Sequence, residues 1–496
     1  MDGGLIDENQ PLLGNTIAQT EVDHSEHDHL VEFDPHGDPE NPLEWPVAFK
    51  WGIVALLALM AFTVTFTCIS VVPVANRIVS DLEGGHESKS ASVLLVTIWE
   101  LGEAAGPLLI APLSEVFGRY PVMNAANCLF LAATILAALS QSTTLFIAAR
   151  ALTGLAVASN VLNPAIVGDI FPSDKRGSAM SFIMLAPLLG GAIGPAISGA
   201  IAQTVGWRQV LWMSAGLAAF CEVLFLTCFR ETYKVPILRN RAARLRAAMH
   251  DDSLKAPFDE GEHKSWAKLW ESVMRPVIVV FSSGVLLTLS LFGSVAFAFY
   301  YIIAVTLPDV LEGLYHLTPA AAGAAFISFS IGSACGVVVC NRLLDRIYVD
   351  LRDSHKGVDR PEFRLPLAIV GGVTLPLAVI SYGWAAHLHA PVWLVLSTVG
   401  LMGFALMLAF LPLTAYVVDA FGLYAASAMT GLIVTRCLMG TFLPLFTGPA
   451  VESLGYGWGF NVFGAATLCL IPIPVVVFRY GSKWRQLSRY TREDGP

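Results

Sequence analysis

The chain contains 496 residues, of which 55% are hydrophobic and only 14% are charged. A soluble domain carries about 25% charged residues, so this chain has too little polar material to cover the surfaces of several soluble domains. The formal net charge of −9 argues against a nucleic-acid partner, and the high apolar fraction excludes a disordered or collagen-like chain. The composition predicts a helical membrane protein that crosses the bilayer many times.

A helix needs about 20 predominantly apolar residues to cross a bilayer, and twelve runs of the sequence meet this requirement. We place them at 51–72, 92–113, 120–139, 145–167, 178–202, 207–229, 277–305, 319–341, 365–386, 391–417, 424–448 and 458–479. They form two six-helix halves, residues 50–229 and 277–480. A cytoplasmic central loop over 230–276 joins the halves, and two cytoplasmic tails flank them, an acidic, disordered one over 1–49 and a second over 481–496.

The placement of charges supports this topology. With both termini in the cytoplasm, all but five of the 30 lysines and arginines fall on inner loops and tails, as the positive-inside rule expects. Glu115 after the second span and Asp345 after the eighth occupy matching positions, which suggests duplication of a six-helix unit. The predicted fold class is therefore an all-α membrane protein with twelve transmembrane helices in two six-helix pseudo-repeats. Because residues 1–49 do not resemble a cleavable signal peptide, we expect the first span to serve as the targeting signal.

The central loop contains two segments suited to the inner membrane surface. Trp266, Leu269, Trp270 and Val273 repeat at helical spacing, and the arginines between 239 and 246 stand among alanines and leucines. Such helices bind the inner leaflet by apolar burial and by attraction to anionic lipid, which makes membrane lipids expected partners. For the arginine segment, a solvated linker is an equally good interpretation.

Five ionisable side chains other than histidine remain within the predicted spans: Glu100, Glu103, Arg150, Glu222 and Arg436. A charge at the centre of the bilayer costs about 2.5–3.5 kcal/mol or more, so each one needs a reason. Glu100 and Glu103 are three residues apart on one helical face, and carboxylates this close disfavour double ionisation. We interpret the pair as a site of proton coupling or substrate contact. The alternative is a water-exposed helix end near the outer membrane edge.

The two arginines within the spans must pair, reach water or contact an anion, because arginine stays charged at physiological pH. Arg150, followed one turn later by Gly154, is a candidate for an aqueous cavity or proton relay, with snorkelling to the outer face as the alternative. Arg436 lies midway along the eleventh span, where snorkelling is a poor explanation. Glu222 is interpreted as part of a structural pair, with a place in the cavity wall as the alternative.

Backbone breakers gather in the fifth span, at Pro187, Gly190, Gly194, Pro195 and Gly199. Small residues at four-residue spacing permit close helix contact, and the prolines bend the helix and free carbonyl groups. We interpret this segment as a hinge in a bundle that rocks. The alternative, generic packing of small residues, would not require the second proline.

Taken together, these residues resemble the major facilitator superfamily, and specifically the fungal branch of its twelve-span drug:proton antiporter family. The resemblance covers residues 42–496. In the loop after the second span, Glu115, Gly118 and Arg119 resemble the superfamily's loop motif, although Glu115 replaces its aspartate and Val116 its arginine. Arg150 with Gly154 resembles a motif whose arginine the family links to proton translocation. Gly190, Gly194, Pro195 and Gly199 resemble the fifth-span motif of antiporters, and Asp419 and Arg436 fit the branch's carboxyl half.

The resemblance implies a proton-driven exporter of hydrophobic or amphipathic organic compounds, working by alternating access. Candidate residues of the substrate cavity are aromatic, with core packing as the alternative for any one of them: Phe292, Phe297, Phe299, Tyr300 and Tyr301. A proton-coupled nutrient importer and a non-transporting membrane receptor are the alternative functions. No GxxxxGK[ST] phosphate loop occurs, which disfavours ATP as the energy source. We expect no cofactor, a monomer, and no enzymatic activity, because the five charges include no nucleophile–base or metal-binding set.

The remaining features of the sequence concern the cysteines, the histidines and the subcellular location. Eight cysteines fall inside apolar runs without a CxxC motif, and we interpret them as small core residues rather than metal ligands or disulfides. The histidines of the acidic tail are interpreted as part of a solvated segment rather than a metal site. Glu8, Leu12 and Leu13 fit an acidic dileucine sorting signal. The resemblance points to the plasma membrane, and this signal to a vacuolar or endosomal membrane.

Overall fold

The structure is a computed structural model that describes residues 31–34, 37–85, 88–249, 266–488 and 491. Within these residues the secondary structure is helical and contains no β-strand. The α-helices are α1 (Val47–Ile69), α2 (Ala75–Leu82), α3 (Lys89–Phe117), α4 (Arg119–Ala138), α5 (Thr143–Leu155), α6 (Ser159–Ile170), α7 (Ser173–Thr204), α8 (Trp207–Cys228), α9 (Lys234–Met249), α10 (Trp266–Ser282), α11 (Gly284–Pro308), α12 (Pro319–Ala324), α13 (Phe326–Ser354), α14 (Pro366–His387), α15 (Val392–Phe421), α16 (Ala425–Phe442), α17 (Thr447–Leu468) and α18 (Pro472–Arg485).

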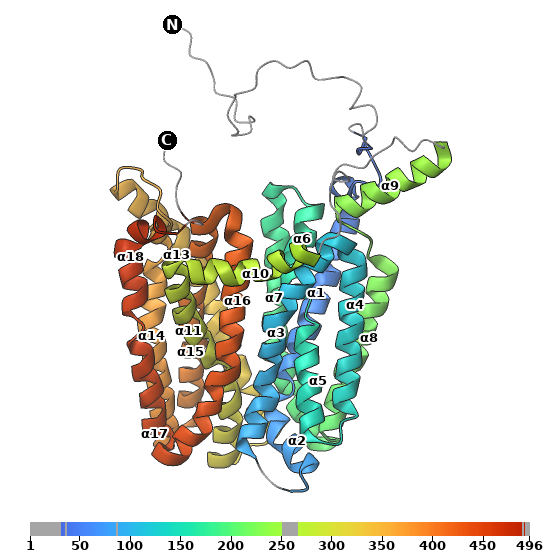
Figure 1. Cartoon of the computed structure of the whole chain (residues 1–496). Coiled ribbons are helices and arrows are strands. Elements are labelled where there is room, and N and C mark those ends of the chain that lie inside the picture. The colour runs from blue at the N-terminus through green and yellow to red at the C-terminus, as the bar shows by residue number, and fades with distance from the viewer. Residues whose placement is uncertain (1–30, 35–36, 86–87, 250–265, 489–490, 492–496) are drawn as a thin grey trace.

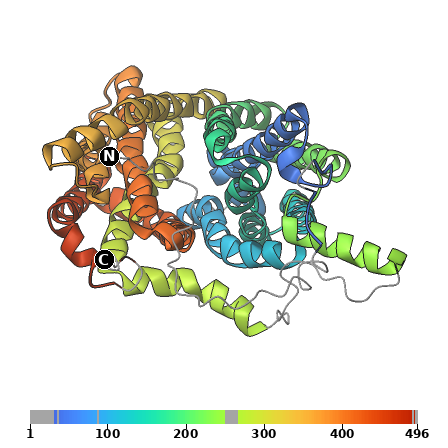
Figure 2. The ribbon, with the colours of Figure 1, turned by 90° about the horizontal axis from the view of Figure 1, so that it is seen from above.

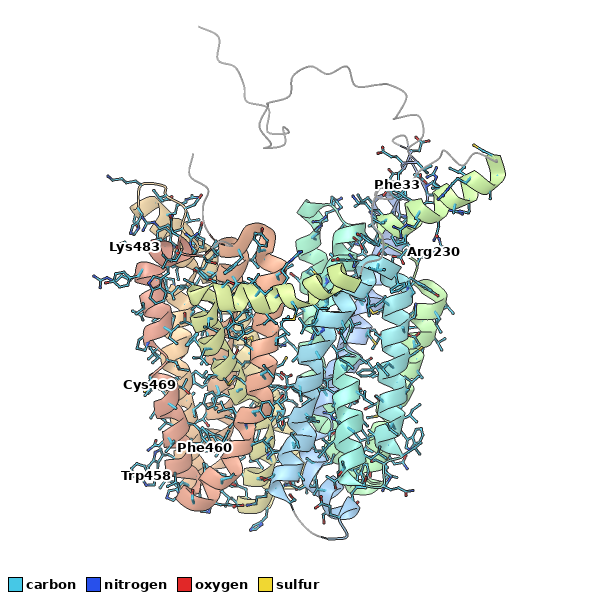
Figure 3. All side chains as sticks on the ribbon, viewed as in Figure 1. Phe33, Arg230, Trp458, Phe460, Cys469 and Lys483 are labelled. Atoms are coloured by element: carbon cyan, nitrogen blue, oxygen red, sulfur yellow. The ribbon has the colours of Figure 1, made fainter. Side chains whose placement is uncertain are left out.

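The helices form two bundles that stand side by side, α1–α8 in the amino-terminal half and α11–α18 in the carboxyl-terminal half (Figures 1 and 2). We call the end of the molecule that carries α9 and the carboxyl end of α18 the terminal face, and the other end the opposite face. Figure 3 shows Arg230 and Lys483 at the terminal face, and Trp458 and Phe460 near the opposite face. Trp458 is 59% exposed, as suits an aromatic ring at the edge of a bilayer.

Eleven helical segments of the described residues are long and apolar enough to cross a membrane. The last one, 425–485, has 61 residues, which amounts to about 90 Å of helix against a hydrocarbon core of about 30 Å. Gly455 has a φ of 74° inside it, a left-handed conformation that breaks the helix and reverses the chain. This segment therefore crosses twice. The predicted all-α fold of twelve spans in two six-helix halves is confirmed.

The seventh and fourth spans are among those that differ from the sequence-based prediction. The seventh span was expected at 277–305, but α10 continues to Ser282 and the next helix begins at Gly284. Ser283 caps that helix, because its hydroxyl accepts a hydrogen bond from the Leu286 amide at 3.4 Å. The fourth span, expected at 145–167, consists of α5 and α6.

Part of the expected amino-terminal tail is bound to α9. Asp38 is 5% exposed and forms an ion pair with Arg241, and Glu40 pairs with Arg244 at 2.6 Å. These acidic and basic residues hold the chain before α1 against the arginine-rich helix, so the disordered tail expected through residue 49 does not extend over residues 37–45. Glu8, Leu12 and Leu13 lie outside the described residues.

The two halves meet near the opposite face. Backbone atoms of α7 and α12 touch there, because Gly199 and Gly323 leave no side chain between them. Asn76 donates a hydrogen bond to Asp309 at 2.7 Å. Lys89 and Glu452 form an ion pair at 3.0 Å. At the terminal face α10 lies across both halves and packs on α3 and α16.

Candidate functional site

Two carboxylates of α3 lie at the interface between the halves. Glu100 and Glu103 are 2% and 7% exposed. Tyr301 of α11 donates its hydroxyl to Glu100 Oε1 at 2.7 Å, and Arg436 of α16 donates to Glu103 Oε1 at 3.1 Å. Both carboxylates of the amino-terminal half are thus held by side chains of the carboxyl-terminal half. Their burial does not fit a water-exposed helix end.

Further contacts fix Glu103 and its partner. Asn160 donates to Glu103 Oε1 at 2.7 Å, and the indole nitrogen of Trp99 donates to Oε2 at 3.3 Å. The guanidinium of Arg436 lies 4.4 Å from the ring centre of Phe297 and 5.8 Å from that of Phe410. An aromatic ring attracts a cation through its negative face. Arg436 is therefore held by a carboxylate and by two aromatic rings at the interface between the halves.

Arg150 of α5 is 1% exposed and bonds to backbone carbonyls. Its guanidinium donates to Leu95 at 3.4 Å, to Thr67 at 3.2 Å and to Cys68 at 2.8 Å. It also lies 4.8 Å from the ring centre of Trp99, the residue that donates to Glu103. Arg150 thus ties α5 to α1 and α3 inside the amino-terminal half, an arrangement that does not fit snorkelling to the surface.

Close backbone approach positions these side chains. A Cβ atom at Gly154 would overlap the carbonyl oxygen of Trp99, so only glycine lets α5 lie directly against α3. Small residues at such contacts are the usual means of close packing between membrane helices. The contact brings Arg150, one helical turn before Gly154, close to the ring of Trp99.

Glu222 lies apart from this group. It is 4% exposed on α8, and the thiol of Cys128 in α4 donates to its Oε1 at 3.5 Å. Its other oxygen has no hydrogen-bond partner. The structure therefore brings Glu100, Glu103 and Arg436 together, joins Arg150 to them through Trp99, and places Glu222 between two helices of one half.

The loop motif between α3 and α4 forms a second polar cluster at the terminal face. Arg119 pairs with Asp169 at 3.3 Å and donates to Ser114 at 2.5 Å. The amide of Arg119 donates to Glu231 at 2.9 Å. Gly118 has a φ of 101°, and a Cβ there would overlap Glu231, so glycine is required. Glu115 itself is exposed.

The other half repeats this arrangement. Arg364, before α14, pairs with Asp345 and also with Asp419 at 2.9 Å. Arg485, at the end of α18, pairs with Glu362 at 2.8 Å, and both side chains are buried. Each half thus carries an arginine bound to the end of a neighbouring span, which agrees with a duplicated unit.

Comparison with known proteins identifies the family. The sequence profile of the Major Facilitator Superfamily matches residues 52–444. The chain belongs to this superfamily. Its members are transporters, so the chain is not an enzyme and is an integral, multi-pass membrane transporter.

Relatives and solved structures agree with this assignment. Efflux pump radE of Floropilus chiversii is 32% identical over 484 residues, which cover 97% of this chain and 89% of radE. MFS transporter cpaT of Aspergillus oryzae is 33% identical over 463 residues, covering 93% and 92% of the two chains. The crystal structure of a D-xylose–proton symporter matches with a TM-score of 0.65 at 16% identity, covering 86% of this chain and 97% of that one. The last likeness concerns the fold alone.

The antiporter-like motif of this transporter lies along α7. Gly190 and Gly194 face Phe62 and Phe66 of α1 within the same half, and Gly199 faces Pro319 in the other half. Pro187 and Pro195 both lie inside the helix. The motif therefore lets α7 pack closely against α1 in its own half and against α12 in the other half.

The aromatic candidates of α11 separate into two groups. Phe292 and Phe299 are 1% and 2% exposed and belong to the packed interior. Phe297 lies against Arg436 and Tyr301 bonds to Glu100. Tyr300 contacts Phe329, with ring centres 5.1 Å apart and ring planes tilted by 51°. Phe297 and Tyr301 therefore line the charged site of the transporter, and Tyr300 lies beside Tyr301.

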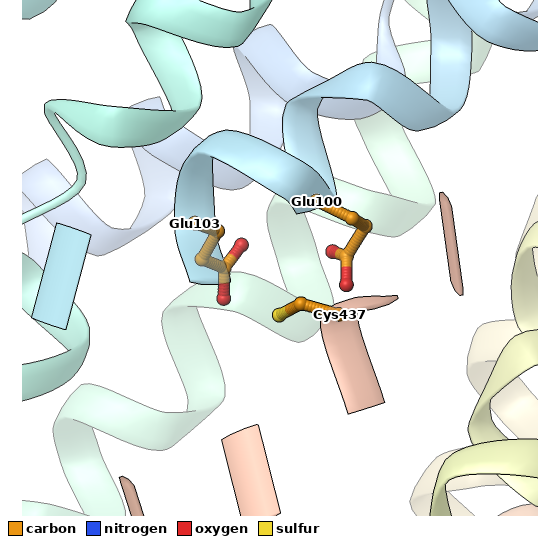
Figure 4. Close-up of side chains that lie close together, drawn as sticks. All are labelled: Glu100, Glu103 and Cys437. Atoms are coloured by element: carbon orange, nitrogen blue, oxygen red, sulfur yellow. The ribbon is translucent and has the colours of Figure 1, made fainter. Parts of the chain in front are cut away.

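Sequence reasoning missed several members of the site. Trp99 and Asn160 carry no charge, so the search for buried charges did not find them. Cys437 was interpreted as a core residue, but its thiol lies beside Glu100 and Glu103 (Figure 4). Its position next to Arg436 in the sequence is the signal that could have found it.

Proposed function

We propose that this transporter exports hydrophobic or amphipathic organic compounds in exchange for protons, by alternating access of its two halves. The observation that carries the proposal is the pairing of Glu103 with Arg436 across the halves, beside Glu100 and its partner Tyr301. A carboxylate can gain and lose a proton, and its counter-ion belongs to the half that must move. A proton bound there therefore changes how strongly the halves attract each other.

The coupling step follows from the charges. With Glu103 ionised, Arg436 pairs with it and holds α16 against α3. A proton on Glu103 removes the charge on which this pair depends, so the contact weakens and the halves can separate. Release of the proton restores the pair. In membrane bundles, ionisable residues in such positions commonly mark ion or proton pathways.

Several observations support the proposed direction of transport and the proposed class of cargo. A relative of this chain, radE, is named an efflux pump, and the α7 motif resembles that of antiporters. In the proposed orientation the terminal face lies on the cytoplasmic side, so the contacts between the halves near the opposite face lie on the outer side. Phe297 and Phe410 beside Arg436 suit a cargo with an apolar ring system. We propose the plasma membrane as its location.

The test uses purified protein in lipid vesicles with a pH-sensitive dye inside. A panel of hydrophobic compounds is added, and proton movement is recorded together with compound movement. Proton flux opposite to compound flux supports export by exchange. Proton and compound flux in the same direction would identify an importer and overturn the proposal, and binding without any flux would favour a receptor.

A further inference from the structure

Three potential metal ligands from the two halves meet at the charged site. Carboxylate oxygens of Glu100 and Glu103 and the Sγ of Cys437 all lie within 4.8 Å of one another, and all three residues are buried. Figure 4 shows the thiol of α16 directed between the two carboxylates of α3. The group differs from an ordinary acidic cluster because it combines oxygen and sulfur donors from two helices.

One of these atoms lacks a partner. Glu100 Oε2 is buried and accepts no hydrogen bond, while Oε1 of the same carboxylate is bound by Tyr301. Leaving a charged oxygen unsatisfied in the interior costs several times what an ordinary hydrogen bond contributes. The residue is 2% exposed, so bulk water does not supply the missing partner. The free oxygen marks a position that a ligand can fill.

The charge balance favours a divalent cation. When a metal binds, both carboxylates bind it in their ionised form, so any proton that Glu100 or Glu103 holds is released to solvent. Arg436 then compensates one of the two negative charges through Glu103 Oε1. When a metal binds, the Cys437 thiol releases its proton to solvent and becomes a thiolate, because thiolate is the form that binds metal. The site then carries a net charge of −2 before the ion is counted. A divalent ion neutralises it.

The donor set selects the kind of ion. Carboxylate and thiolate together suit a borderline or soft ion such as Zn²⁺ or Cd²⁺, whereas Mg²⁺ and Ca²⁺ take oxygen ligands alone. Ligand atoms at about 2.0–2.3 Å from zinc lie roughly 3.5 Å from one another around a tetrahedron. The three ligand atoms therefore need to move only slightly closer to one another to bind the same ion.

We propose that Glu100, Glu103 and Cys437 form a binding site for a soft or borderline divalent cation, Zn²⁺ or Cd²⁺, which joins α3 to α16 and holds the two halves together. Such an ion inhibits transport because both of its anchors must separate when the halves rock. The proposal rests on the geometry of the three side chains and does not depend on the proposed proton coupling.

The experiment titrates Cd²⁺ into the purified full-length protein in detergent and follows the ultraviolet charge-transfer absorption of a Cd–S bond. We expect one Cd²⁺ bound per chain with this absorption. Cys437→Ser should abolish the absorption and weaken binding at least tenfold, and Glu100→Gln should weaken it while keeping the Cd–S absorption. Cys340→Ser is the matched control, because Cys340 is equally buried but bonds to the Met407 carbonyl away from any carboxylate.

The outcomes are distinguishable. An unchanged Cd–S absorption in a Cys437→Ser protein that elutes as a single folded species would overturn the proposal, as would wild-type affinity in Glu100→Gln. If Cys340→Ser were the only variant to lose Cd²⁺ binding, the site would lie elsewhere, and the proposal would also be overturned. Failure of proton exchange in vesicles, by contrast, would overturn the proposed function and leave the titration unaffected.

Discussion

Glu103 in α3 and Arg436 in α16 form a buried ion pair between the two halves, with side chains that are 9% and 16% exposed. Removing one partner of a buried pair costs about 3–5 kcal/mol, because the other charge is left without compensation. This pair therefore contributes strongly to the arrangement in which α3 and α16 are in contact. Any change in the charge of Glu103 shifts the balance between that arrangement and one in which the helices separate.

We predict that Glu103→Gln abolishes transport driven by a pH gradient, lowering the initial rate at least tenfold, while membrane insertion is retained. Glutamine keeps the shape of the side chain but cannot exchange a proton. The rate is measured in vesicles with and without an imposed gradient. Glu115→Gln, a change of an exposed glutamate on the same helix, should leave the rate unchanged. Normal gradient-driven transport in a Glu100→Gln, Glu103→Gln double variant would contradict the prediction.

Arg150→Lys is expected to lower both transport and thermal stability. The guanidinium bonds to three carbonyls on two helices, and a lysine ammonium is a single point charge that cannot reach all of them. Each buried carbonyl left without a donor costs about 1–3 kcal/mol. Melting temperature is measured in detergent and flux in vesicles. Arg208→Lys is the control, because Arg208 lies at the start of α8 and makes one hydrogen bond, to the Ser140 carbonyl. Wild-type flux and melting temperature in Arg150→Lys would refute the assignment.

The sequence was sufficient to predict the number of spans and the buried charges. Both predictions follow from one local property, the cost of placing polar groups in hydrocarbon, which acts on each residue separately. Glu103, Arg150 and Arg436 could therefore be singled out without knowledge of their surroundings. The internal duplication was also visible, in the matching positions of Glu115 and Asp345.

The partners of these charges could not be predicted. Glu103 and Arg436 are 333 positions apart in the chain, and no local periodicity indicates which faces of α3 and α16 meet. In the loop motif the acidic residue in the sequence pattern, Glu115, is exposed, and Arg119 instead pairs with Asp169 at the end of α6. Such pairings depend on how helices pack, which is a property of the whole bundle. The position of the Cys437 thiol beside Glu100 and Glu103 depends on the same packing.

The contact between Asp38 and Arg241 should respond to pH. Burial raises the pKa of Asp38, but hydrogen bonds from the Glu40 amide and from Arg241 lower it, and the pKa lies below its ordinary value. A lowered pKa means that the contact is stabilised at pH values above about 3.9, the ordinary value, and is lost as pH falls through the lower pKa of the folded state. We expect the segment before α1 to detach from α9 only in strong acid.

Spin labels at the exposed positions Glu32 and Met249 report this contact as a distance distribution. The distribution should be narrow at neutral pH and broaden in acid below the folded-state pKa. Asp38→Asn should be broad at neutral pH already. Glu40→Gln is the control, because its pair with Arg244 is 38% and 66% exposed and exposed pairs contribute little. A narrow distribution for Asp38→Asn at neutral pH would show that other contacts hold the segment.

The last prediction concerns Gly199, where α7 touches α12 of the other half. A Cβ atom there would overlap the carbonyl oxygen of Pro319, and overpacking of this kind costs about 1–3 kcal/mol. Because the contact joins the two halves, the cost falls only on the arrangement in which they meet at the opposite face. Gly199→Ala should therefore shift the equilibrium away from that arrangement by about 5- to 150-fold and slow turnover, while substrate binding is retained.

Labels at Val205 and Leu388, two exposed residues on opposite halves near this face, measure the shift as an increase in the longer-distance population. Gly191→Ala is the matched control on the same helix, because a Cβ at Gly191 would lie 3.9 Å from Thr65 and Tyr300, an ordinary contact distance. It should leave both the distance distribution and turnover unchanged. If Gly199→Ala gave the wild-type distribution and turnover, the α7–α12 contact would be loose packing that the transport cycle does not use.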